Sequence, residues 1–315
     1  MKLIIQIPCL NEEKTLGETL KDLPKHIKGI DVIELLVIDD GSTDRTSELA
    51  KSLGVHHVVR FPQNRGLARA FEAGIERALA ENADIIVNTD ADNQYNGTDI
   101  ETIVRPILDG KAEMVIGARP IGKIQHFSPI KKLLQYIGSW VVRLASKTDI
   151  PDAPSGFRAM SRGAAMKLNV FNEYTYTLET IIQAGQKGIA LTSVPIRVNG
   201  DLRPSRLVKS IASYIKRSII TIVRIFMAYQ PFHFFVIPGM VSAFLGFLIG
   251  LRFLYFFFVE GGGGHIQSLI LALLLFGCGF FLITIGLLAD LISVNRKLLE
   301  KIDWKVQKLS EKIEK

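Results

Sequence analysis

Two aspartates one residue apart, Asp90 and Asp92, carry the clearest chemical signal in the sequence. They follow the apolar run 84–89, which predicts a buried strand. Carboxylates at the end of such a strand can face one crevice and share a hard divalent cation, Mg²⁺ or Mn²⁺, that keeps open positions for a substrate diphosphate. The ion would act as the Lewis acid that stabilises a departing diphosphate. A solvated acidic turn is the alternative interpretation of this pair.

Strand and helix patterns alternate over residues 1 to about 200. The expected strands cover 3–7, 32–38, 55–61, 84–89, 114–117 and 190–198, and the expected helices cover 12–23, 44–53, 66–80, 98–108 and 176–186. This alternation predicts an α/β fold with a Rossmann-like, mostly parallel sheet and helices on both faces.

Three polar loops follow predicted strands, at residues 8–12, 39–42 and 90–94. Ligands of open parallel sheets bind beyond the carboxyl ends of the strands, so we expect these loops to meet at one edge. Helix capping is a purely structural explanation for one polar residue in a loop. It does not explain the paired acids in two of the three.

The sequence changes character from Pro204 onward. Residues 204–231 place isoleucines at helical spacing among basic residues, which predicts an amphipathic juxtamembrane helix on a membrane surface. Two apolar runs follow, and each exceeds the roughly 20 residues that cross a bilayer. We therefore expect an α/β domain over 1–203, juxtamembrane helices over 204–231, a two-helix transmembrane hairpin over 232–294 and a basic C-terminal helix over 295–315.

The net charge of +7 arises beside the apolar runs. Basic residues crowd the segments before and after the hairpin, whereas its connection at 260–265 has neither lysine nor arginine. The positive-inside rule therefore predicts that the α/β domain and both termini are cytoplasmic. The same distribution favours a membrane surface, and not nucleic acid, as the partner of the basic residues.

Further motifs lie in a fixed order along the α/β domain: Pro8-Cys9-Leu10-Asn11-Glu12-Glu13, Ile38-Asp39-Asp40-Gly41-Ser42-Thr43-Asp44, Asn64-Arg65-Gly66, Asp90-Ala91-Asp92-Asn93-Gln94, Gly117-Ala118-Arg119 and Asp152-Ala153-Pro154-Ser155-Gly156-Phe157-Arg158. With them the chain resembles family 2 glycosyltransferases of the GT-A fold, most closely the polyprenyl-phosphate (dolichyl-phosphate) hexose synthases. The resemblance spans nearly all of residues 1–206. It implies an enzyme that moves a hexose from a nucleotide-diphosphate sugar, a UDP-sugar favoured over a GDP-sugar, to a lipid phosphate.

The resemblance also implies roles for individual residues. The nucleotide-sugar would contact Pro8, Leu10, Glu12, Ile38, Asp39, Asp40, Asp90, Ala91, Asp92, Gln94, Arg119, Arg197 and Arg206. Mg²⁺ or Mn²⁺ would be held by Asp90, Asp92 and Gln94, and the acceptor phosphate by Arg119, Lys131, Gln135, Ser155 and Arg158. Catalysis would depend on Asp92, Arg119 and Arg158. At Lys131 and Gln135 the chain departs from the dolichyl-phosphate mannose synthases, which carry an arginine and a serine there.

The scarcity of candidate general bases in the sequence indicates the kind of acceptor. A hydroxyl acceptor normally needs a general base, and the corresponding stretch 176–180 offers only Glu179. A lipid phosphate is largely ionised at pH 7, because its second pKa is near about 6, and needs only cations beside it. We therefore expect a single displacement with inversion at the anomeric carbon, which gives a polyprenyl-phosphate monosaccharide.

Two alternatives remain open. One is transfer to a glycerolipid hydroxyl with Glu179 as the base, and the other is a membrane-anchored nucleotide-sugar-binding protein without turnover. A processive polysaccharide synthase should show a Gln-x-x-Arg-Trp segment and further spans, and neither is present. For Arg158, an ion pair with Asp152 is a structural alternative to a role at the acceptor.

A homo-oligomer is expected from the first apolar run. Gly246 and Gly250 form a Gly-x-x-x-Gly spacing there, which lets helix backbones approach closely. Packing of the same glycines against the second run is the alternative.

Overall fold

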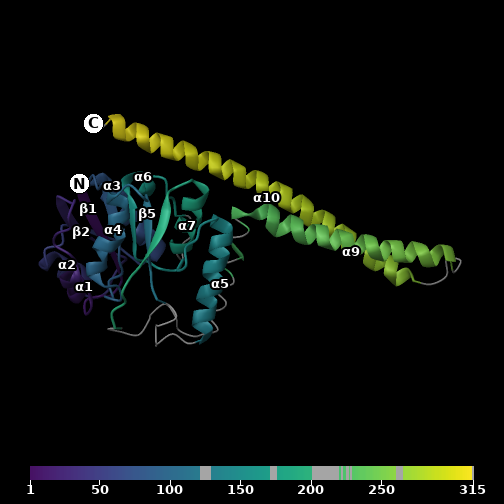
Figure 1. The fold of residues 1–315 in the computed structure, drawn as a ribbon, viewed down its shortest axis with the longest axis horizontal. Helices are drawn as coiled ribbons and strands as arrows, with labels where there is room; N and C mark the ends of the chain where they lie inside the picture. Colours follow the sequence, from purple (N-terminus) through teal and green to yellow (C-terminus); the bar gives the residue numbers. More distant parts are fainter. Residues whose placement is uncertain are drawn as a thin grey trace. The chain divides into compact units, whose positions relative to one another are not determined.

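The computed structural model describes the chain except for residues 121–128, 171–175, 201–219, 221–222, 225–226, 228, 260–264 and 314–315. The chain forms two compact units, Met1–Ile219 and Ile220–Lys315. Figure 1 shows a sheet with surrounding helices in the first unit and two long helices in the second.

Seven strands among the described residues form one sheet, in the order β3-β2-β1-β4-β6-β5-β7. They are β1 (Lys2–Cys9), β2 (Val32–Asp39), β3 (His57–Arg60), β4 (Ile85–Asn88), β5 (Met114–Ala118), β6 (Arg158–Ser161) and β7 (Leu191–Pro195). All neighbours are parallel except β6, which lies antiparallel between β4 and β5. The predicted mostly parallel sheet is confirmed, and its six expected strands are present with different ends. The short β6 was not predicted.

The helices of the first unit are α1 (Leu16–Asp22), α2 (Thr46–Ser52), α3 (Leu67–Ala80), the short 3-10 helix η1 (Gly97–Asp99), α4 (Ile100–Leu108), α5 (Pro129–Ser146), α6 (Arg162–Ala165) and α7 (Thr177–Gln186). The five expected helices are all present. They begin later than predicted. The first residues expected for α1 and α2 belong to the polar loops at the strand ends, and those expected for α4 belong to η1. Helices α5 and α6 were not predicted.

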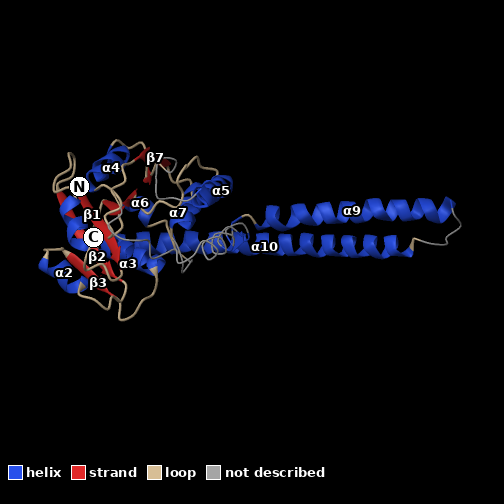
Figure 2. Ribbon diagram, turned by 90° about the horizontal axis from the view of Figure 1, so that it is seen from below, coloured by secondary structure: helices blue, strands red, loops and turns tan. Residues whose placement is uncertain are grey.

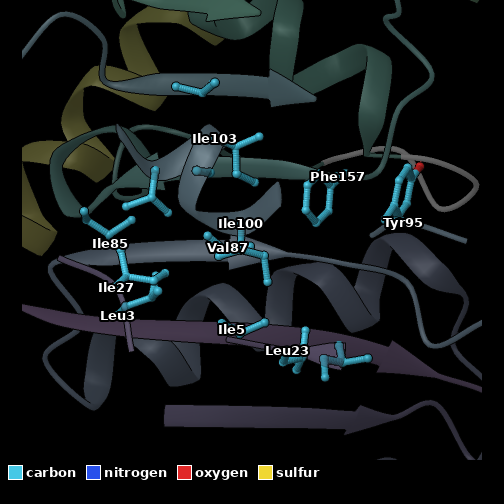
Figure 3. Packing of buried hydrophobic residues seen from close by; sticks show 14 of the residues in the cluster. Leu3, Ile5, Leu23, Ile27, Ile85, Val87, Tyr95, Ile100, Ile103 and Phe157 are labelled. Carbon is cyan, nitrogen blue, oxygen red and sulfur yellow. The ribbon is translucent and has the colours of Figure 1, made fainter. Parts of the chain in front are cut away.

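The sheet has two different faces because successive strand side chains point to opposite sides. On one face Leu3 and Ile5 of β1 and Val87 of β4 pack in one core with Ile100 and Ile103 of α4 (Figure 3). The other face is less uniformly apolar. There Phe71 of α3 stacks on Tyr176 with ring centroids 3.8 Å apart, close to a row of buried polar residues described below.

The strand order brings the polar loops together. From β1 the chain moves to β2 and β3 on one side and then returns to β4 on the other side of β1. Ligands of open α/β sheets bind at such a switch point, beyond the carboxyl ends of the strands. The register pairs Cys9 with Asp39 and Gln6 with Asn88, so the loops after β1, β2 and β4 leave the same edge, as expected.

In the second unit, α9 (Pro231–Val259) lies side by side with the N-terminal part of α10 (Ile266–Ile313), and α10 continues beyond the start of α9 (Figure 2). Both are long and apolar enough to cross a membrane. The two predicted apolar runs match them, but the second run and the predicted C-terminal helix form one continuous α10. Most of the predicted juxtamembrane segment 204–231 lies outside the described residues.

Gly246 lies where α9 packs closely against α10. A Cβ atom at that position would lie 2.8 Å from the Ala272 carbonyl oxygen and 2.9 Å from the Phe276 amide nitrogen of α10. At Gly250 the nearest atom, Ala272 Cβ, is 4.0 Å away. Close packing against the second helix therefore accounts for Gly246, in agreement with the alternative given for this Gly-x-x-x-Gly pair, and a homo-oligomer through these glycines loses its support.

Candidate active site

The loops after β1 and β2 are joined by hydrogen bonds. The Asn11 amide donates to Ser42 Oγ at 2.9 Å, and the Thr43 amide donates to Asn11 Oδ1 at 2.8 Å. The Glu12 amide donates to Thr46 Oγ1 at 2.9 Å. These contacts fix one wall of the sheet edge. The predicted nucleotide residues Pro8, Leu10, Glu12 and Ile38 all lie in or next to this wall, buried or half-buried.

Asp39 and Asp40 are both buried at the end of β2. Asp40 accepts hydrogen bonds from the amides of Arg65 at 2.7 Å and Gly66 at 3.0 Å. Burial raises the pKa of Asp40 above its usual value, although these two amides lower it. Asp39 accepts from the Ser42 amide at 2.8 Å and from the Ser47 hydroxyl. The pair thus holds the loop before α3 and the turn before α2 against the sheet edge.

The Asp90–Gln94 loop follows β4 at the switch point. Asp90, Asp92 and Gln94 are half-buried and Ala91 is buried. Asp92 Oδ1 accepts from the Gln94 amide at 3.2 Å, around Asn93 in the left-handed backbone region at φ 56°. Burial and the neighbouring charge of Asp92 raise the pKa of Asp90 to about 7, against the opposing effect of Arg119 and Arg158. Two close carboxylates in a poorly solvated place favour a bound cation.

The donor set of this loop fits a divalent metal shared with a substrate. Within the described part of the chain, no group of three or more His, Cys, Asp or Glu side chains is arranged to hold an ion. The protein therefore offers two carboxylates, and the Gln94 amide oxygen is a further candidate. Mg²⁺ is typically bound in proteins through one or two carboxylates together with substrate phosphates and water.

Arg119 lies just beyond β5 and forms a two-pronged ion pair with Asp152. Its Nε donates to Asp152 Oδ2 at 2.7 Å and its Nη2 to Oδ1 at 2.9 Å, and both side chains are buried. Burial lowers the pKa of Arg119, but Tyr95 and Asp152 outweigh it and raise that pKa above its usual value. Asp152 therefore pairs with Arg119, and not with Arg158 as the structural alternative had it.

Arg158 is fully buried at the start of β6. It donates to the carbonyl oxygens of Thr177, at 3.2 Å, and Ser155, and to the Thr180 hydroxyl. Its guanidinium lies over the Tyr176 ring, 5.1 Å from the centroid, and burial lowers its pKa. Among the described residues, neither Arg158 Nε nor the buried Ser155 hydroxyl has a hydrogen-bond partner. The structure therefore places Arg158 beneath the site, where it supports the 155–158 turn, and a direct contact with the acceptor stays a prediction.

A row of polar side chains, of which only Arg158 was predicted from the sequence, crosses the sheet below Asp90. Gln6, Asn88 and Arg158 occupy neighbouring positions on β1, β4 and β6. Asn88 accepts from Gln6 Nε2 at 2.9 Å and donates to the Gly156 carbonyl at 2.9 Å and the Tyr176 hydroxyl at 2.8 Å. Asn88 within an otherwise apolar run was the available signal. Tyr176 gave none, because only the fold brings it to β4.

The segment after β7 crosses the Asp90–Gln94 loop. Asn199 donates its backbone amide to the Gln94 carbonyl at 2.9 Å and its side-chain amide to the Asn93 carbonyl at 3.1 Å. Arg197 is exposed and pairs with Asp99, from Nη2 to Oδ1 at 2.6 Å. Arg206 lies outside the described residues. Lys131 and Gln135 belong to α5, but their side chains are likewise outside the described part.

The chain belongs to glycosyl transferase family 2, whose family model matches residues 4–168. Proteins of this family are enzymes, and this one is a glycosyltransferase. The carboxylate loop at the switch point and the predicted motifs lie inside the matched region.

Several relatives can be compared over most of their length. An uncharacterized protein of Methanocaldococcus jannaschii is 36% identical over 201 residues, which cover 62% of this chain and 81% of that protein. The UDP-N-acetylglucosamine–dolichyl-phosphate N-acetylglucosaminyltransferase of Methanococcus voltae is 29% identical, over 61% and 83%. The glycosyltransferase AglJ of Haloferax volcanii is 26% identical over 95% of this chain and 96% of its own, so that match includes the C-terminal helices.

Solved structures agree on the fold. Glucosyl-3-phosphoglycerate synthase of Mycobacterium tuberculosis, in complex with phosphoglyceric acid, superposes with a TM-score of 0.55 at 22% identity, over 71% of this chain and 79% of that one. The same enzyme in complex with Mn²⁺, UDP-glucose and phosphoglyceric acid gives a TM-score of 0.53. The GT-A fold expected from the sequence is confirmed.

Proposed function

We propose that this protein transfers a hexose from a nucleotide-diphosphate sugar, with a UDP-sugar favoured over a GDP-sugar, to a polyprenyl or dolichyl phosphate. The observation that carries the proposal is the Asp90/Asp92 pair, which lies at the switch point of the sheet within electrostatic reach of Arg119 and Arg158. The same chain carries two helices of bilayer-crossing length. Relatives named for dolichyl-phosphate and undecaprenyl-phosphate sugar transfer support this acceptor class.

The donor would bind across the β1, β2 and β4 loop ends. The wall made by Pro8, Leu10, Glu12, Ile38, Asp39 and Asp40 would hold the base and ribose. Asp90, Asp92 and Gln94 would hold Mg²⁺ or Mn²⁺ together with the diphosphate. The metal would offset the charge that develops on the leaving diphosphate. A related fold crystallised with Mn²⁺ and UDP-glucose supports this choice.

The acceptor would approach from the side of Arg119. An ionised phosphate attacks without a base, so this side needs only positive charge. Arg119 and the helix α5, which carries Lys131, are the candidate cations, while Ser155 and Arg158 would shape the turn beside Asp90. Attack opposite to the leaving diphosphate gives inversion at the anomeric carbon.

The membrane would supply the lipid. We propose that residues 1–203 form the cytoplasmic catalytic domain, 204–231 lie on the membrane surface, 232–294 cross it twice and 295–315 return to the cytoplasm. The basic flanks of the hairpin favour this orientation.

Transfer assays test the proposal directly. Purified full-length protein with a panel of radiolabelled nucleotide-sugars and a short-chain polyprenyl phosphate should give a labelled lipid that is labile to mild acid, plus a nucleoside diphosphate. Labelled lipid that forms only with diacylglycerol would contradict it.

Glycerolipid transfer is the second candidate, and one observation favours it. Glu179 is buried in the first turn of α7, next to Thr180, whose hydroxyl contacts Arg158. In this candidate, Glu179 would be the base that accepts the proton of the hydroxyl.

A further inference from the structure

The C-terminal half of α10 carries a stripe of exposed apolar side chains. Leu299, Ile302, Val306 and Leu309 follow one another at intervals of three, four and three residues, and their side chains are 57–66% exposed. The same spacing continues in the sequence to Ile313. Apolar residues with this alternation form the a and d positions of a heptad, the pattern by which two helices pack as a coiled coil.

The stripe lies on the face of α10 that the hairpin leaves uncovered. Contacts within the unit use the opposite face: Phe276 approaches Gly246, and Arg296 lies over the Tyr229 ring, 4.2 Å from its centroid. Ser293 and Glu300 on that face are buried. At a rotation of 100° per residue, the stripe lies about 150° around the helix axis from this packed face. Within the described residues of this unit, the stripe therefore has no covering partner.

Lipid is a poor candidate to cover it. Helix α10 is continuous for 48 residues, or about 72 Å at 1.5 Å per residue, against a hydrocarbon core of about 30 Å. Residues 295–313 therefore continue the axis of the spanning segment beyond the core.

We propose that a second copy of this chain covers the stripe, as a parallel coiled coil formed by the ends of two α10 helices. Two copies inserted in the membrane with the same orientation present α10 in parallel, a step that rests on the proposed membrane hairpin. Charge agrees with this direction. Lys305 and Lys312 precede Val306 and Ile313 and occupy the flanking g positions. In an antiparallel pair, g positions face g positions, so lysine would oppose lysine. In a parallel pair, g positions face e positions, and the e residue opposite Lys305 is Ser310.

Confinement in the membrane would compensate for the shortness of the stripe. Two heptads bind weakly in solution, but two anchored chains meet at a much higher effective concentration. In the second heptad, Val306 and Ile313 at a with Leu309 at d fit the preference of two-stranded coiled coils, whereas Leu299 at a and Ile302 at d in the first heptad do not.

Disulfide crosslinking of the full-length protein in membranes tests this arrangement. Leu299→Cys and Leu309→Cys are each placed in a Cys278→Ser background, because Cys278 is exposed and Cys9 is buried. Both variants should form a covalent species of twice the 35.0 kDa chain mass. The matched control Lys301→Cys, exposed but off the stripe, should crosslink at least about tenfold more weakly.

The outcomes separate the alternatives. Homodimers at both positions require a parallel register. Crosslinking only between a Leu299→Cys chain and a Leu309→Cys chain, equal crosslinking at Lys301→Cys, or crosslinks only to a different protein would overturn the proposal. Native mass spectrometry in nanodiscs adds a second readout: the wild type should be a dimer and Ile302→Lys/Leu309→Lys a monomer. Alkaline carbonate extraction tests separately whether the hairpin is inserted in the membrane. A wrong membrane assignment is therefore distinguished from a wrong coiled-coil assignment.

Discussion

Gly156 lies directly against the carboxylate of Asp90. A Cβ atom at Gly156 would be 3.2 Å from both Asp90 carboxylate oxygens and 3.1 Å from the Tyr176 hydroxyl. The Gly156 amide also donates to the Tyr95 hydroxyl at 3.0 Å, and its carbonyl accepts from Asn88. One residue thus connects the proposed metal loop with the turn that leads to Arg158.

Gly156→Ala should weaken transfer while leaving the fold intact. The added methyl group must displace Asp90 or Tyr176 by a few tenths of an ångström. Because a 1 Å misplacement can cost about 10²-fold in rate, a shift of a few tenths of an ångström should lower kcat/KM by about 3- to 10-fold and raise the metal concentration for half-maximal activity. Metal titrations of initial rates measure both.

The matched control is Gly163→Ala in α6, where no atom lies within 4 Å of an added Cβ. It should retain wild-type activity. Wild-type metal dependence in Gly156→Ala would show that its contact with Asp90 has no part in metal binding.

Asp92→Asn should remove most turnover. The substitution deletes one of the two charges proposed to hold the metal, and loss of metal stabilisation of the leaving group costs several kcal/mol of barrier. Thermal unfolding should be nearly unchanged, because Asp92 is half-buried in a loop. Rates at saturating Mg²⁺ and Mn²⁺ provide the measurement, with Asp109→Asn on the exposed end of α4 as the control. More than a tenth of wild-type turnover would remove Asp92 from this role.

The Arg119–Asp152 pair should show separate effects on stability and on activity. Arg119→Ala leaves a buried carboxylate without its partner, and breaking such a pair typically costs about 3–5 kcal/mol. Arg119→Ala/Asp152→Ala removes both charges and should regain part of the free energy of unfolding. If Arg119 acts on a phosphate, the double variant stays as inactive as Arg119→Ala. Denaturant unfolding and transfer rates on the same preparations distinguish the two, and recovery of activity in the double variant would indicate a structural role alone.

Sequence patterns predicted the elements with long apolar signals and missed those that depend on tertiary contacts. Strand β1 and helix α9 are predominantly apolar runs, and both were expected. Strand β6 is four residues long, begins with a charged residue and exists because it inserts between β4 and β5. No local pattern encodes that insertion.

Dependence on tertiary contacts also explains why the burial of Arg158 was not predicted. Arg158 was predicted to hold the acceptor phosphate because the chain resembles the polyprenyl-phosphate hexose synthases and because a lipid phosphate needs cations beside it. Its burial is decided by α7, about twenty positions away, through Tyr176 and Thr180. The two carboxylate pairs were easier to interpret, because their position at strand ends follows from the strand pattern alone.

Glu179→Gln distinguishes the two acceptor classes. If an ionised phosphate attacks, no proton has to be removed, and the variant should lose only a small factor in kcat. If a hydroxyl attacks, the variant loses its base, and the rate should fall roughly 10²–10⁴-fold. Because Glu179 is buried, the unfolding midpoint of the Glu179→Gln variant and its KM for the donor are measured in parallel, so that a folding defect is recognised. A loss of 10²-fold or more with normal donor KM and normal stability would replace the lipid phosphate by a lipid hydroxyl as the acceptor.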